Sequence, residues 1–90
     1  MKLRVARHTN RIKAMEEFYL RLGFKVSGRF QGNNGYDGVF LAFPDTDWHL
    51  EFTQSPEEPN HIPDEDDLLV LYPGDDIIES YLSSLQKLGF

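Results

Sequence analysis

The chain contains no cysteine among its 90 residues, which excludes disulfide bridges, thiolate metal sites and thiol nucleophiles. It also lacks an apolar run long enough to cross a membrane, for which about 20 residues are needed. The first residues, MKLRVARHTN, do not contain the apolar segment of a signal peptide. These absences favour a cytoplasmic location and no membrane partner.

Basic residues are scarce, and they are missing altogether from one segment. The net charge is −6, and residues 57–67, EEPNHIPDEDD, carry six acids and no base, which leaves nine acids and nine bases elsewhere. No basic stripe is present that could follow a phosphate backbone, so the composition argues against a nucleic-acid partner. The 40% apolar and 13% aromatic content predicts one small globular domain.

The first half of the chain alternates between strand and helix patterns. KLRVARH at 2–8 predicts a half-buried strand. Thr9 or Asn10 is expected to cap the following helix, and Gly23 to end it. Its apolar stripe is formed by Ile12, Met15, Phe18, Tyr19 and Leu22.

Three further strands are predicted at 24–30, 36–43 and 48–54. Asn34-Gly35 suits a tight hairpin turn, and the apolar run VFLAF places the strand at 36–43 in the middle of a sheet. After a proline-containing acidic loop, LLVLY at 68–72 predicts a fifth strand, and Asp76 with Glu79 an acidic cap for a second helix beginning near Ile78.

Two segments resemble each other and indicate an internal repeat. EEFYLRLGF at 16–24 and SYLSSLQKLGF at 80–90 are both amphipathic, follow a predicted strand and end in Leu-Gly-Phe or its near equivalent. The alternative is a chance sharing of a common helix stop. The repeat is favoured, and it predicts one complete βαβββ unit followed by a βα beginning of a second.

The stretch WHLEFTQ at 48–54 carries the most suggestive polar residues. In an extended strand His49 and Glu51 point to the face opposite Leu50. A carboxylate on the polar face of a strand is commonly solvated or paired with a base. In the strand at 2–8, His8 shares a face with Arg4.

The helix exit FYLRLGF, the strand HLEFTQ and the order of elements resemble the vicinal oxygen chelate superfamily, which includes glyoxalase I, extradiol dioxygenases and the bleomycin- and fosfomycin-resistance proteins. The resemblance spans the whole chain. It implies an α+β fold, with a first βαβββ unit at 1–55, an acidic loop at 56–67 and an incomplete second βα unit at 68–90.

The resemblance also implies site residues. Glu51 falls on the family's fourth-strand metal ligand and would be ligand or general base, Arg4 falls on or near the first-strand ligand, and Asp67 near the first ligand of the second unit. His8 and His49 are further candidates for ligand binding. The implied cofactor is one divalent ion, Ni²⁺, Zn²⁺, Fe²⁺ or Mn²⁺, or none, because an Arg4–Glu51 ion pair would oppose a cation.

Two functions follow from the resemblance. One is metal-dependent lyase or dioxygenase chemistry on a small substrate with vicinal oxygens. The alternative is a metal-free protein that binds or sequesters a small drug or metabolite. Because one unit with a βα extension leaves an unpaired sheet edge, we expect a homodimer, or a longer chain that supplies the missing C-terminal half.

Overall fold

A computed structural model describes residues 1–60 and 64–90. The chain divides into two compact units, one formed by Met1–Asn60 and one by the residues that follow. The predicted acidic loop at 56–67 includes 61–63, which lie outside the described residues.

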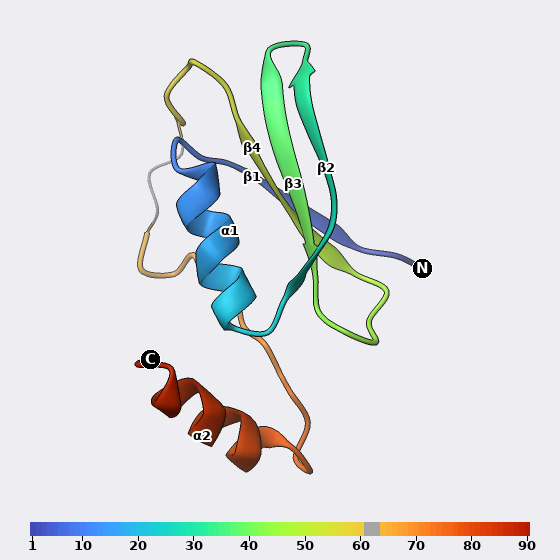
Figure 1. The fold of residues 1–90 in the computed structure, drawn as a ribbon, viewed down its shortest axis with the longest axis vertical. Helices are drawn as coiled ribbons and strands as arrows, with labels where there is room; N and C mark the ends of the chain where they lie inside the picture. The colour runs from blue at the N-terminus through green and yellow to red at the C-terminus, as the bar shows by residue number, and fades with distance from the viewer. Residues whose placement is uncertain (61–63) are drawn as a thin grey trace. The chain divides into compact units, whose positions relative to one another are not determined.

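The first unit is a four-stranded mixed sheet with one helix. Its strands are β1 (Arg4–His8), β2 (Lys25–Asn33), β3 (Tyr36–Ala42) and β4 (His49–Gln54), and its helix is α1 (Ile12–Arg21). The strand order is β1-β4-β3-β2, with β1 parallel to β4 and the other neighbours antiparallel (Figure 1). The predicted α+β βαβββ unit is therefore confirmed, and β3 is central as expected.

The register of the sheet decides which residues share a face. Glu51 lies opposite Ala6 of β1 and opposite Phe40 of β3. Arg4 is the partner of His49. Because side chains alternate along a strand, these residues point to one side, and their sequence neighbours point to the other.

The other side holds the core, and α1 covers it. The buried apolar residues are Phe24, Val39, Leu41, Leu50 and Phe52. Tyr19 of α1 packs on Phe52 with ring centroids 5.4 Å apart, and Trp48 meets Phe24 at 5.9 Å. The apolar row of WHLEFTQ is thus the inner face of the sheet.

The beginning of α1 differs from the sequence expectation. Neither Thr9 nor Asn10 caps the helix, whose N-cap is Arg11 without a side-chain bond. Instead the backbone N–H of Ile12 donates to Oε1 of Gln54 at 2.8 Å. A side chain from β4 therefore satisfies one of the open donors of the first turn.

Both helices end in the same way, while the internal repeat itself stays a prediction. Phe24 N–H donates to the carbonyl of Tyr19 at 3.0 Å, and Phe90 N–H to that of Leu85, also at 3.0 Å. In each case the preceding glycine has a positive φ, 105° at Gly23 and 91° at Gly89. The two segments therefore share a helix stop in three dimensions and not only in sequence.

The second unit contains α2 (Ile78–Lys87) and the segment before it. The strand predicted at 68–72 is wrong, since these residues form no regular structure and Leu68, Leu69, Val70 and Tyr72 are exposed. An apolar run forms a strand only when neighbouring strands accept its backbone hydrogen bonds, and the described residues provide none for it. The predicted Asp76 cap is also wrong, because α2 begins after Ile77 without a side-chain cap.

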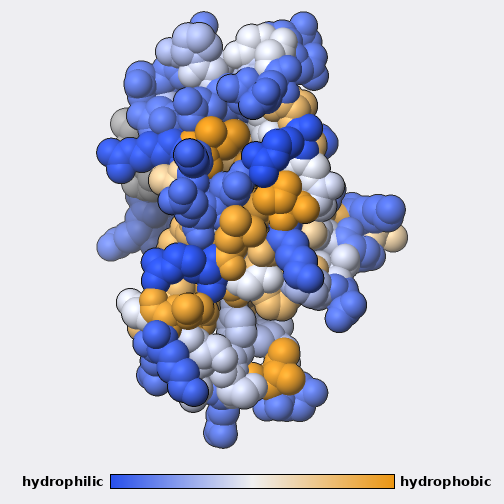
Figure 2. All heavy atoms as spheres, in the orientation of Figure 1, coloured by the Kyte–Doolittle hydropathy of each residue, from blue (hydrophilic) through white to orange (hydrophobic). Residues whose placement is uncertain are grey.

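Apolar atoms of several side chains reach the surface among hydrophilic ones (Figure 2). In the part of the chain that the structure describes, no helix is long and apolar enough to span a membrane.

Replacing Tyr19 with phenylalanine is expected to change how stability depends on pH. Burial raises the pKa of Tyr19 above its ordinary value of 10.0, and the nearby Arg7 charge partly offsets this. The folded state thus holds the phenolic proton more tightly than the unfolded state, so stability contributed by Tyr19 is present below about pH 10 and is lost as the pH rises further. In urea titrations at pH 7 to 11, Y19F should lose less stability above pH 10 than the wild type. An identical loss in both proteins would contradict the effect of burial.

Candidate functional site

The face of the sheet opposite α1 carries the candidate site residues and is called the open face below. Its members are Arg4, His8, Phe30, Phe40, His49 and Glu51, which the strand register places on one side. No described element of Met1–Asn60 packs over this side, because α1 lies on the core side. The open face therefore combines charged and aromatic side chains in one accessible region.

Glu51 is the unusual residue of this face. Its side chain is only 11% exposed, and Nε of Arg4 lies 3.3 Å from its Oε1. The contact is an ion pair that lacks hydrogen-bond geometry. Oε1 is buried, and it accepts no hydrogen bond from the described residues. A buried acceptor left in this state costs free energy, and it is a ready partner for a donor on a ligand.

Arg4 is placed to act with Glu51. Its side chain is 58% exposed, and the ion pair expected from the family resemblance is confirmed. Because the Arg4 side chain is more than half exposed, its guanidinium can also donate to an anionic or carbonyl oxygen of a ligand. Acceptor and donor groups thus lie side by side on the open face.

Aromatic rings continue the face away from this pair. His49 contacts Phe40 with ring centroids 5.5 Å apart, and Phe40 contacts Phe30 at 5.8 Å. All three rings are half-buried and so present part of their surface. His49 was predicted from its strand position, whereas the sequence reasoning did not assign Phe30 or Phe40 to the site.

His8 lies at the end of β1, four residues after Arg4 and on the same face of the strand. Its Nε2 is 3.2 Å from the Ser55 hydroxyl, and its ring meets Tyr36 edge-on at 5.8 Å. Ser55 also accepts the backbone N–H of Glu57 at 3.3 Å. These contacts fix the histidine at the margin of the open face.

Asp67 belongs to the second unit. Its carboxylate accepts the N–H of Asp64 at 2.8 Å, and its own N–H donates to the Asp64 carbonyl at 2.9 Å. It therefore stabilises a tight turn. Its role as a metal ligand stays a prediction.

The donor set does not fit a divalent ion. Such ions need three or four protein ligands around one point, and among the residues that the structure describes no group of three His, Asp or Glu side chains meets this need. Among the residues of 1–60 and 64–90, the carboxylate that is buried is that of Glu51, and it stands beside a guanidinium, which repels a cation.

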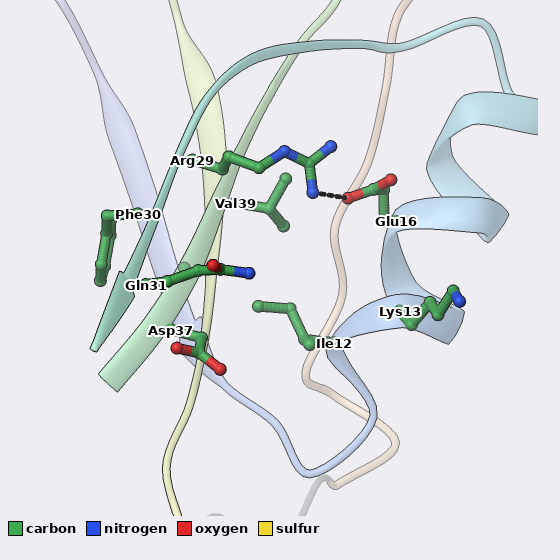
Figure 3. A pocket seen from close by; sticks show the side chains of 9 residues that line it. Ile12, Lys13, Glu16, Arg29, Phe30, Gln31, Asp37 and Val39 are labelled. Atoms are coloured by element: carbon green, nitrogen blue, oxygen red, sulfur yellow. Dashed lines mark hydrogen bonds and ion pairs between the residues drawn. The ribbon is translucent and has the colours of Figure 1, made fainter. Parts of the chain in front are cut away.

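A small pocket of about 220 Å³ lies on the core side, between α1 and the β2–β3 hairpin. Ile12, Val39 and Gln31 point into it, while Arg29 bonds Glu16 at 3.0 Å on one side and Phe30 points away (Figure 3). Its volume is below the roughly 300 Å³ at which ligand pockets begin, and two of its flanking charges, Arg29 and Glu16, pair with each other. The open face is the better candidate site.

A sequence signal for the aromatic part of the site exists. Gly28-Arg29-Phe30 and Gly38-Val39-Phe40 repeat the same Gly-x-Phe pattern in adjacent antiparallel strands. The register pairs Gly28 with Phe40 and Phe30 with Gly38. Each ring can therefore lie over the glycine of the opposite strand. Once the hairpin turn is located, the positions of the two Gly-x-Phe patterns in the sequence are enough to suggest this arrangement.

Comparison with known proteins agrees with the fold and the order of elements. Residues 3–53 match the model of the YycE-like N-terminal domain. The chain is 37% identical over 92 residues to the uncharacterized protein YycE of Bacillus subtilis (strain 168), covering 99% of this chain and 66% of that protein. The chain therefore spans just under two thirds of the length of its curated relative.

The crystal structure of a Bacillus subtilis YycE protein of unknown function, described as a candidate glyoxalase/fosfomycin resistance protein, superimposes with a TM-score of 0.76. The match has 37% identity and covers 98% of this chain and 66% of that chain. The resemblance to the vicinal oxygen chelate superfamily is thereby confirmed, and the chain belongs to the YycE-like N-terminal domain family.

Proposed function

We propose that this chain binds a small polar molecule on its open face and does so without a metal ion. The observation that carries the proposal is the buried Oε1 of Glu51, which accepts no hydrogen bond and lies 3.3 Å from Arg4. A ligand that donates to Glu51 and accepts from Arg4 would satisfy both groups at once. The glyoxalase/fosfomycin resistance description of the related structure supports a small-molecule role of this kind.

Calorimetric titration tests the proposal. The probes are fosfomycin and the hemithioacetal of methylglyoxal with glutathione, which represent the two protein classes named for the related structure. We expect at least one probe to bind the metal-free wild type, and R4M and E51Q each to weaken it about tenfold or more, as for the loss of a charged hydrogen bond. Equal affinity in the wild type, R4M and E51Q would mean that the probe binds away from this pair. If neither probe binds the wild type, the chain has neither a fosfomycin-binding nor a glyoxalase-type role.

Metal-dependent lyase or dioxygenase chemistry is the second candidate. The glyoxalase part of the description of the related structure supports it, although the ligands besides Glu51 would have to come from additional protein. The ion named by the family resemblance would be Ni²⁺, Zn²⁺, Fe²⁺ or Mn²⁺.

The change R4H is expected to strengthen metal binding. It removes the cation beside Glu51 and adds an imidazole at the register partner of His49, which favours a His-His-Glu donor set. In Ni²⁺ and Zn²⁺ titrations we expect at least a tenfold gain in affinity over the wild type. The control R7H places the same side chain on the opposite face of β1 and should give no gain. Equal affinity for R4H and R7H would contradict the assignment.

We further propose that the chain is completed by additional protein, either a second copy or further chain. Leu68 is 76% and Tyr72 89% exposed, and the described sheet leaves one side of β1 unpaired. Both features are costly in an isolated domain. Light scattering should give twice the chain mass for a homodimer, and a stable monomer at high concentration would contradict that form of the proposal.

A further inference from the structure

Two phenylalanine rings lie over glycines on the open face in a reciprocal arrangement. A Cβ at Gly38 would overlap the Phe30 ring, and a Cβ at Gly28 would stand 3.3 Å from Cδ2 of Phe40. Each ring therefore occupies the space above the opposite strand's glycine. Rings that cover glycines in this way stabilise a sheet. They also give the open face an aromatic surface at the positions where the glycines have no side chain.

These rings lie next to the polar pair. Phe40 is the register partner of Glu51, and its ring is inclined by 50° to Phe30 and by 86° to His49. A planar group can therefore stack on one ring and meet the edge of its neighbour, which is the preferred geometry of aromatic clusters. The aromatic rings therefore lie directly beside the unsatisfied carboxylate of Glu51.

From this arrangement we propose that the open face selects a planar aromatic or conjugated molecule that carries an adjacent hydrogen-bond donor and acceptor, as an aromatic carboxamide does. The planar part rests on Phe40 and Phe30, the N–H donates to Glu51, and the carbonyl oxygen accepts from Arg4. The inference rests on the proposed function, because both place the ligand on the open face.

Three related fragments test separately whether the face requires a planar ring and whether it requires an N–H donor. Benzamide has the planar ring and the donor, cyclohexanecarboxamide keeps the donor on a puckered ring, and N,N-dimethylbenzamide keeps the planar ring without an N–H. Affinities and binding positions are measured by amide chemical-shift titration of the full chain. Benzamide should bind about three- to tenfold more tightly than cyclohexanecarboxamide, the ratio corresponding to one aromatic contact, and also more tightly than the dimethyl compound.

Variants test which residues create these preferences. F40L keeps an apolar side chain but removes the ring, and should bring the benzamide to cyclohexanecarboxamide ratio close to one. F18L makes the same change on α1, where Phe18 is 43% exposed, and should leave the ratio unchanged. E51Q should reduce the discrimination against N,N-dimethylbenzamide. If F40L fails to fold, the affinities of the wild type for the three fragments still show whether a planar ring and an N–H donor are preferred.

The outcomes distinguish the two proposals. Shifts on the open face with equal affinity for planar and puckered rings would overturn this inference and leave the proposed function standing. An absence of shifts on the open face with every fragment would overturn this inference, whereas binding of fosfomycin or the hemithioacetal that E51Q weakens would still leave the proposed function standing. If the fragments do not bind and F40L converts a dimer to a monomer in light scattering, the face is an interface between copies, which also overturns the inference.

Discussion

Replacing Leu41 with alanine is expected to lower the free energy of unfolding by about 2–5 kcal/mol, the usual cost of opening a cavity at a fully buried leucine. Leu41 is 0% exposed and lies in the central strand β3. Small domains have little stability in reserve, so this change should remove most of the folded population near physiological temperature.

Urea unfolding followed by circular dichroism measures this effect. The matched control is L20A, because Leu20 lies on α1 and is 41% exposed. Its loss should stay below about 1 kcal/mol, since alanine favours helix and little buried surface is removed. Equal losses for the two variants would mean that the inner face of the sheet is not the main core.

Replacing Glu51 with methionine is expected to raise the free energy of unfolding by about 1–3 kcal/mol, the usual cost of a buried unsatisfied polar group, while abolishing ligand binding. The buried Oε1 of Glu51 accepts no hydrogen bond from the described residues. Methionine has a similar length and no polar oxygen, and Arg4 stays solvated because its side chain is 58% exposed.

Glu16 provides the matched control. It also pairs with an arginine, but its carboxylate accepts a hydrogen bond from Arg29 at 3.0 Å. E16M should therefore be neutral or slightly destabilising, because an exposed ion pair contributes at most about 1 kcal/mol. A stability gain at Glu51 and none at Glu16 would show that Glu51 is retained for binding. A loss of stability in E51M would mean that the carboxylate is satisfied in the folded protein.

Alternation along the strands was enough to predict much of the first unit. It placed Leu50 inside and Glu51 outside, and the Asn34-Gly35 turn, with φ of 53° and 82°, set the register of the β2–β3 hairpin as expected. These features are local, because they depend on the period of the strand and on the backbone preference of two turn residues.

Contacts between distant segments were harder to predict. Gln54 accepts from Ile12 across 42 residues of sequence, and no local pattern at Thr9 or Asn10 indicates this. The strand expected at 68–72 failed for a related reason, since strand formation depends on neighbours that the run itself does not specify. The Arg4–Glu51 pair was predicted only because the family resemblance placed both positions together.

The central claim is that the open face around Glu51 binds small molecules without a metal. The most direct measurement is amide chemical-shift mapping of the metal-free chain against a library of small polar and aromatic compounds. We predict that the largest shifts fall in β1, β4 and β3, at 4–8, 49–53 and 38–42, and that E51Q reduces them. Shifts confined to the pocket lined by Ile12, Arg29 and Gln31, or unchanged by E51Q, would contradict it.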